Sequence, residues 1–235
     1  MDLSTFLEGV GARDFGQGSE AEIVDVIAEM VAHPEYPCLG ARSVFRRDSA
    51  TVEVFESMDS PRTLTELAGH LVTFAEAQAD NPDFGSFVAV FRGPRIEDER
   101  DFEGLLWGVL QQLHDGDTQP WADGVSPDPS AAHFSFSHEG TAFFIVGLHP
   151  RASRVARRAP LPTLVFNLHE QFERLRASGA HERMRDTIRA RDSRVQSSIN
   201  PMAADHGAES EARQYSGRAV EDDWTPPFTV KETDD

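Results

Sequence analysis

Apolar residues recur at the three- and four-residue spacing of an amphipathic helix in several parts of the chain. The clearest stretch places Ile23 and Ile27 on one face, and Pro34 follows where the pattern stops. Ser60-Pro61 is a typical helix start, because proline is well tolerated at the first helical position. The spacing predicts helices over residues 20–31, 61–80, 97–114, 168–178 and 181–194.

Other stretches have the length and composition of strands. Residues 86–92 form a continuous apolar run, which is typical of a central strand. Residues 133–137 alternate in polarity and residues 141–148 are strongly apolar, so 138–140 are expected to form a hairpin turn. The predicted strands are 39–45, 51–55, 86–92, 133–137, 141–148 and 164–166, and the first two are expected to form a hairpin.

The order of these elements predicts the fold class, because the strands come in pairs with helices between the pairs. We expect an α+β fold with a largely antiparallel sheet of about five to six strands, flanked by helices, in a single domain. Residues 1–195 should form this domain. Residues 196–235 lack clear periodicity, and we expect a C-terminal extension that wraps the domain and is disordered at its last residues.

The charge balance is strongly acidic, with 22 Lys and Arg against 40 Asp and Glu and a net charge of −18. Lys231 is the one lysine in the sequence. An acidic, lysine-poor surface suits a salt-loaded cytoplasm, so we expect a halophilic source; a high-GC genome would explain the missing lysines but not the acidic excess. Such a surface repels phosphate backbones, which argues against a nucleic-acid partner.

The N-terminal residues lack the basic and apolar segments of a signal peptide, and no apolar run approaches the roughly 18 residues of a membrane span. A cytoplasmic protein without a membrane partner is therefore expected.

Cys38 is the single cysteine, which excludes an intramolecular disulfide and a cysteine-rich zinc site. Local motifs of hydrolases, phosphate-binding loops, dinucleotide-binding enzymes and HExxH zinc enzymes are also absent.

Two histidines stand at the ends of predicted elements, where pockets tend to form. His114 ends the predicted helix 97–114. It is either an ordinary helix-ending residue, stabilised by the helix dipole when charged, or a metal ligand whose second ring nitrogen binds a carboxylate or carbonyl. His149 follows the apolar stretch 141–148 and precedes Pro150.

Four arginines follow His149 in this otherwise acidic chain: Arg151, Arg154, Arg157 and Arg158. The planar fork of donors on each arginine suits the carboxylate or phosphate of a bound ligand. The same side chains are equally able to pair with the carboxylates of the protein itself. The pattern leaves both interpretations open.

Cys38 and His169 are further candidate ligands. Cysteine most often packs as a small core residue, but the thiolate of Cys38 could instead ligate iron. His169 follows Asn167, a predicted helix N-cap, and the helix dipole there disfavours a charged imidazole. A neutral histidine is a good metal ligand.

Segments spread from Pro37 to Phe228 resemble the YqcI/YcgG family. The resemblance covers most of the chain, and its segments are specific in combination rather than singly. They are Pro37-Cys38, 107–121 with the family's Leu-His-x-x-Asp pattern at 113–117, 134–136, 143–150, 153–158, 162–167, 200–202 and 214–218.

This resemblance implies a heme protein that hydroxylates a guanidino or amino nitrogen of an amino acid, as members of the family do in guanitoxin and D-cycloserine biosynthesis. The implied cofactor is heme b. The implied partners are a small, arginine-like amino-acid substrate, O₂ and an electron donor. Two other functions stay open: a heme-handling or sensor protein without oxygenase turnover, and a structural domain without heme.

Six residues are expected to bind the implied heme: His114, His149, Cys38, Arg154, Arg157 and Arg158. His114 matches the family pattern and is the expected axial ligand of the iron, with His149, Cys38 and His169 as alternatives. The arginines would pair with the heme propionates or with a substrate carboxylate.

Overall fold

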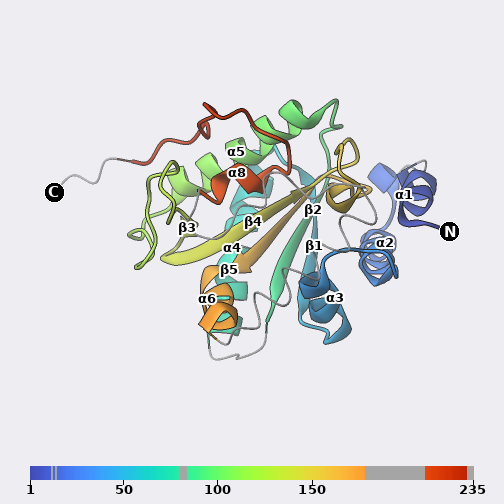
Figure 1. The fold of residues 1–235 in the computed structure, drawn as a ribbon, viewed down its shortest axis with the longest axis horizontal. Coiled ribbons are helices and arrows are strands. Elements are labelled where there is room, and N and C mark those ends of the chain that lie inside the picture. The colour runs from blue at the N-terminus through green and yellow to red at the C-terminus, as the bar shows by residue number, and fades with distance from the viewer. Residues whose placement is uncertain (12, 14, 80–83, 178–209, 232–235) are drawn as a thin grey trace.

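A five-stranded sheet forms the centre of the molecule in the computed structural model, which describes residues 1–11, 13, 15–79, 84–177 and 210–231 (Figure 1). The strand order is β1-β2-β5-β4-β3. The bounds are β1 (Ala50–Ser57), β2 (Ser86–Gly93), β5 (Thr163–Leu168), β4 (Thr141–Leu148) and β3 (Phe136–His138). β1 and β2 are parallel, and the other three pairings are antiparallel. The predicted α+β fold with a largely antiparallel sheet is therefore confirmed.

One face of the sheet packs against helices α4 (Pro61–Gln78), α5 (Glu99–Gly116) and the short α8 (Ala212–Tyr215). The core on this face is rich in aromatic side chains, among them Phe87 and Phe166 of the sheet and Trp107 of α5. Residues alternate between the two faces along each strand, so the neighbours of these phenylalanines point to the opposite side.

The other face packs against α1 (Leu3–Gly11) and α2 (Glu20–Ala32), with the 3-10 turns η1 (Phe15–Gln17) and η2 (Val155–Arg157) beside them. Val88 and Val90 of β2 and Leu148 of β4 belong to this second core. α6 (His169–Ala177) continues directly from β5 and contacts β4 and β5. None of the described helices is long and apolar enough to cross a membrane.

The predicted strand over 39–45 is wrong, because these residues form helix α3 (Leu39–Arg46). Ala41 and Phe45, four residues apart, pack against the second core, which is a helical spacing. The Sγ of Cys38 caps the helix by accepting the backbone N–H of Ala41 at 3.4 Å. β1 consequently has no hairpin partner before it and pairs in parallel with β2, with α4 as the connection.

The other predicted elements agree more closely with the structure. Ser60 is the N-cap of α4 and Pro61 its first residue, as expected. The predicted β3–β4 hairpin is confirmed, with Glu139 and Gly140 both at positive φ, as a tight primed turn requires. The predicted helix over 181–194 lies outside the described residues.

The described part of the predicted extension runs along α5 after α8, which Figure 1 shows as the red segment beside the green helix. The backbone N–H of Thr229 donates to Gln111 Oε1 at 2.8 Å, and Gln111 Nε2 donates to the Thr229 carbonyl at 3.0 Å. Nearer to α8, the buried Arg218 donates to the carboxylate of Glu103 at 2.8 Å. We call residues 216–231 the C-terminal strap.

Candidate functional site

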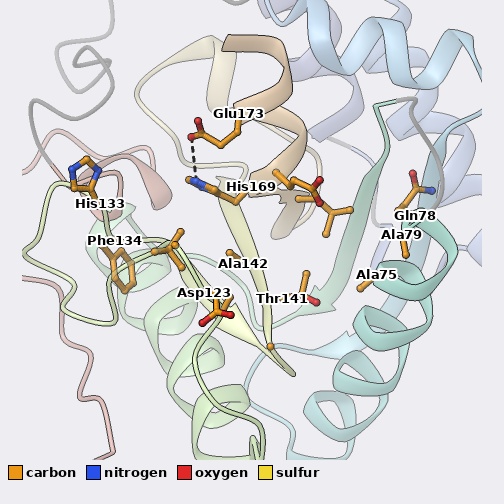
Figure 2. Close-up of a pocket in the computed structure, with 16 residues that line it drawn as sticks. Ala75, Gln78, Ala79, Asp123, His133, Phe134, Thr141, Ala142, His169 and Glu173 are labelled. Atoms are coloured by element: carbon orange, nitrogen blue, oxygen red, sulfur yellow. Dashed lines mark ion pairs between the residues drawn. The ribbon is translucent and has the colours of Figure 1, made fainter. Parts of the chain in front are cut away.

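A cavity of about 830 Å³ lies between the end of α4, the start of α6 and the β3–β4 turn (Figure 2). We call it the acidic cavity, because carboxylates stand at its rim. Its lining consists of Ala75, Gln78, Ala79, Ala122, Asp123, Gly124, Val125, His133, Phe134, Gly140, Thr141, Ala142, Leu168, His169, Glu170 and Glu173. No lysine or arginine is among these described lining residues.

Charged groups lie at the rim of the acidic cavity and apolar groups line its interior. Asp123, Glu170 and Glu173 are exposed, whereas Phe134 and Leu168 are buried. Negative charge at the rim of an apolar cavity attracts cations. The arrangement suits a small cation attached to an apolar stem.

His169 opens α6 and connects two carboxylates at the edge of the acidic cavity. Its Nε2 lies 3.3 Å from Glu173 Oε1, the pair drawn dashed in Figure 2, and its Nδ1 lies 3.8 Å from Glu211 Oε1. Glu211 is buried, and its Oε1 has no hydrogen-bond partner in the structure as described. Burial raises the pKa of the nearby Tyr215 hydroxyl, and the charge of Glu211 raises it further. The sequence singled out His169, but it gave no sign of these carboxylate neighbours.

A second hollow, which we call the α4–α5 groove, has a volume of about 570 Å³. It is lined by Pro61, Leu64, Thr65, Ala68, Gly69, Val72, Gln112, Leu113, Asp115, Gly116, His138 and Glu139. The β3–β4 turn contributes to both hollows, because Glu139 lines the groove and the next residue, Gly140, lines the cavity.

His138 is a buried histidine in the α4–α5 groove that the sequence did not distinguish from ordinary surface or core residues. Its Nδ1 lies 3.6 Å from Asp117 Oδ2, and both side chains are almost fully buried. Burial lowers the pKa of His138, against the opposing effect of Asp117. The available signal was indirect: Asp117 belongs to the family-like 113–117 pattern, and His138 directly precedes the predicted turn.

His114 is buried in the last turn of α5, where it holds the C-terminal strap. Its Nε2 accepts the backbone N–H of Lys231 at 3.0 Å, and its ring lies 5.3 Å from that of Phe228. Burial lowers the pKa of His114, and the charge of Lys231 lowers it further. One of its two ring nitrogens therefore already has a protein partner in this structure.

His149 lies at the opposite end of α5 from His114. Its ring stacks on Phe102 at 4.3 Å, and Phe102 precedes His114 by twelve residues, or about 18 Å of helix. Burial lowers the pKa of His149 to about 4, and the charge of Arg157 contributes in the same direction. Its Nδ1 is buried without a hydrogen-bond partner among the described residues. The structure thus separates the two leading candidate ligands.

Cys38 and Arg157 lie near His149. Burial raises the pKa of the Cys38 thiol, whereas the charge of Arg157 lowers it. The Arg157 guanidinium donates to the carbonyls of Gly147 at 3.2 Å and Gln214 at 3.0 Å. The structure therefore brings Cys38, His149 and Arg157 together, at a place remote from His114.

The other two arginines belong to the same loop. Arg154 is buried at the start of η2. Arg158 Nε donates to the Ala152 carbonyl at 2.8 Å. Because a guanidinium has five N–H donors, a bond to one carbonyl leaves donors with which Arg158 could bind an anion.

The donor atoms present fit a heme bound through one histidine. The Nδ1 of His149 is buried without a hydrogen-bond partner in the described part of the chain, and the buried ring of His138 interacts with Asp117 and with the backbone of Leu113. Burial keeps these rings neutral, which is the form that ligates iron. Among the described residues, no group of three or more His, Cys, Asp or Glu side chains is arranged to hold a metal ion; a single axial ligand does not require one.

Comparison with known proteins identifies two relatives. The chain is 26% identical over 163 residues to the uncharacterized protein YqcI of Bacillus subtilis (strain 168), covering 67% of this chain and 64% of that protein. It is 27% identical over 165 residues to the putative N(omega)-hydroxy-L-arginine synthase DcsA of Streptomyces lavendulae, covering 66% and 62%. The aligned parts thus span under two thirds of each relative's length.

No solved structure matches the chain. The assignment of the fold therefore rests on the structure described above. The model of one protein family matches residues 27–229, from α2 to the C-terminal strap. This range contains the acidic cavity, the α4–α5 groove and every candidate ligand discussed above. The chain belongs to the YqcI/YcgG family.

Proposed function

We propose that this protein hydroxylates a nitrogen atom of a small cationic amino acid, with a guanidino group like that of arginine, bound in the acidic cavity. The observation that carries the proposal is the cavity itself, which combines rim carboxylates with an apolar interior and no cationic lining residue among those described. The relative DcsA, which is named as a putative N(omega)-hydroxy-L-arginine synthase, supports the same chemistry.

A guanidinium group suits this rim because it binds carboxylates through two parallel N–H donors. Asp123 stands on one side of the acidic cavity and Glu173 on the other (Figure 2). The methylene stem of the substrate would pack against Phe134 and Leu168. His169 would keep the Glu173 carboxylate in place through their 3.3 Å contact.

The reaction inserts one oxygen atom of O₂ into a substrate N–H bond and releases the other as water. The balance requires two electrons and two protons, which an external electron donor and the solvent would supply. Heme b is the cofactor that we propose for this step, and when bound it would supply the activation of O₂. His138 and His149 are the candidate histidine ligands, and Arg154 and Arg158, which follow His149 in the same loop, would be candidate partners for the propionates of a heme bound at His149.

The proposal is tested with protein purified in concentrated salt after expression with a heme supply. The protein is incubated with L-arginine, O₂ and a reducing system, and mass spectrometry is used to search for arginine that has gained one oxygen atom. Product that depends on protein, O₂ and reductant is the expected result. A heme-loaded, reduced protein that yields no oxygenated product from arginine or other guanidino amino acids would contradict the proposal.

Variants connect this activity to the acidic cavity. The double substitution Asp123→Asn and Glu170→Gln removes two rim charges with little change in shape. We expect kcat/KM for L-arginine to fall about tenfold, since each exposed charge pair contributes up to about 1 kcal/mol. Glu76→Gln is the matched control, because Glu76 is exposed on α4 beside the cavity without lining it.

A further inference from the structure

Tyrosine and tryptophan are rare in this chain, and three of these residues lie in one row. The sequence has two tyrosines and three tryptophans. The ring of Tyr215 stacks on that of Trp107, with the ring centroids 5.7 Å apart and the ring planes at 22°. The centroid of Trp107 in turn lies 6.1 Å from that of Trp224 on the C-terminal strap. We call Tyr215, Trp107 and Trp224 the aromatic row.

The aromatic row runs from behind the acidic cavity to the surface of the molecule. Tyr215 in α8 and Trp107 in α5 are buried, whereas Trp224 is half-buried. The centroid of the Tyr215 ring lies 6.1 Å from that of Phe134, which lines the acidic cavity (Figure 2). A single ring therefore connects the inner end of the row with the place where the substrate nitrogen would be oxidised.

Tyr215 has a base beside its hydroxyl group, as a redox-active tyrosine requires. Tyrosine and tryptophan are the aromatic side chains that lose an electron most readily, and an oxidised tyrosine gives its hydroxyl proton to a base within reach. The carboxylate of Glu211 interacts with the Tyr215 hydroxyl. Glu211 is buried, and its Oε1 has no hydrogen-bond partner in the structure as described, so this oxygen can accept a proton.

Trp107 differs from Tyr215 in the surroundings of its proton. Its indole Nε1 is buried without a hydrogen-bond partner in the described part of the chain. An indole N–H is a donor only, so an oxidised Trp107 keeps its proton where no acceptor is present. The return of one electron then restores the residue without any movement of a proton, which suits an intermediate position in an electron path.

We propose that the aromatic row carries electrons from a reductant in solution to a one-electron oxidant that forms from O₂ in the acidic cavity when substrate is absent. The origin of the oxidant rests on the proposed function, and the path rests on the ring geometry. The oxidant takes one electron from Tyr215, whose hydroxyl proton passes to Glu211. Trp107 returns an electron to Tyr215, which takes the proton back, and Trp224 and then the reductant restore Trp107. The oxidant is thereby reduced before it attacks the side chains around it.

The path is tested without cofactor or substrate, by oxidising the full chain from its surface in concentrated salt. A light flash on tris(bipyridine)ruthenium(II) with persulfate removes one electron from surface side chains, and the same row should then be oxidised inward as far as Tyr215. Electron paramagnetic resonance of rapidly frozen samples should show a tyrosyl radical. Tyr215→Phe should abolish this signal. Tyr36→Phe should retain it, because Tyr36 belongs to the core on the other face of the sheet.

Trp107→Phe interrupts the aromatic row but keeps a ring at this buried position, and it should lower the tyrosyl yield at least tenfold. Trp121→Phe is the matched control. Trp121 packs against the same core, but within the described part of the chain its ring meets Phe134 and His114 rather than a member of the row. Trp224→Phe, at a half-buried position, repeats the test should Trp107→Phe not fold, and circular dichroism checks the fold of each variant.

Three results would overturn the path. They are a folded wild type without a tyrosyl radical, a radical that disappears in Tyr36→Phe instead of Tyr215→Phe, and a yield that Trp107→Phe and Trp224→Phe lower no more than Trp121→Phe does.

The protective role is tested in the heme-loaded protein kept with O₂ and a reductant but without substrate. Trp107→Phe should accumulate oxidised side chains, measured by mass spectrometry of peptides, several times faster than Trp121→Phe. Equal rates of damage in the two variants would refute protection by the aromatic row.

The path and the proposed function fail separately, because the flash experiment needs neither heme nor arginine. A radical on Tyr215 in a protein that oxygenates no guanidino amino acid would leave the path standing and refute the proposed function. Oxygenated arginine from a protein in which Tyr215 is not oxidised would do the reverse.

Discussion

Three buried histidines of this chain differ in what surrounds their ring nitrogens. His114 accepts a backbone N–H, His138 faces a carboxylate, and His149 stacks on a phenylalanine. The positions of these histidines in the sequence show which elements they end. Their partners are Lys231, Asp117 and Phe102, which lie on other elements and cannot be identified from those positions. Sequence reasoning could thus nominate His114 and His149 and still miss His138.

The lowered pKa of His149 makes the stability of the fold depend on pH. In the unfolded chain this imidazole titrates near 6.5, and in the folded chain near 4, so the unfolded state binds more protons between these values. Stability from this residue is therefore present above about pH 6.5 and is lost as the pH falls toward 4. The loss is about 3 kcal/mol, from the size of the pKa difference.

Chemical denaturation at pH 7, 5.5 and 4 measures this effect. His149→Phe keeps an aromatic ring on Phe102 and removes the titrating group, so its free energy of unfolding should fall less steeply than that of the wild type. Carboxylates contribute equally to both proteins and cancel in the comparison. Identical pH dependence of the two proteins would show that the His149 ring is not held neutral by burial.

At the level of elements, the C-terminal strap depends on a buried ion pair. Arg218 of the strap and Glu103 of α5 are each less than a tenth exposed and lie 2.8 Å apart. Arg218→Ala would leave the Glu103 carboxylate buried without its cation, which should lower the free energy of unfolding by about 3 kcal/mol. Denaturant titration measures the change.

Arg62→Ala is the control for this prediction, because Arg62 forms an exposed pair with Glu66 on α4. Its loss should cost at most about 0.5 kcal/mol, as for other exposed helical pairs. Equal effects of the two substitutions would show that the strap is not fixed to α5 through Arg218.

The helices and strands also show which elements sequence patterns can predict. Long periodic helices such as α2 and α5, and the apolar strand β2, were predicted to within a few residues. The stretch 39–45 was not, because seven residues are too few to separate helical from strand periodicity, and a cysteine cap is not a usual helix signal. That error concealed the parallel pairing of β1 with β2.

At the level of the whole molecule, a net charge of −18 should make stability depend on salt. Repulsion among carboxylates opposes folding, and the screening length falls from about 10 Å at 0.1 M salt to about 3 Å at 1 M. We predict that the melting temperature rises by several degrees between 0.1 and 2 M KCl, measured by circular dichroism. A melting temperature independent of KCl would contradict salt adaptation and favour biased genome composition as the source of the missing lysines.

The acidic cavity is also a property of the whole molecule, since α4, α6 and the β3–β4 turn each supply part of its lining. The composition shows an excess of carboxylates. The fold shows in addition that some of these carboxylates surround the acidic cavity, whose described lining contains no cationic side chain. The family resemblance supplied the chemistry, and the structure supplies a place for the substrate.

Charge selectivity tests this account most directly. L-arginine and L-citrulline have nearly the same shape, but citrulline carries a neutral urea in place of the guanidinium. The account predicts that the heme-loaded protein, with O₂ and a reductant, oxygenates arginine with a kcat/KM at least tenfold above that for citrulline. Equal rates for the two compounds, or a preference for citrulline, would contradict the assignment of the acidic cavity as a site for a cationic substrate.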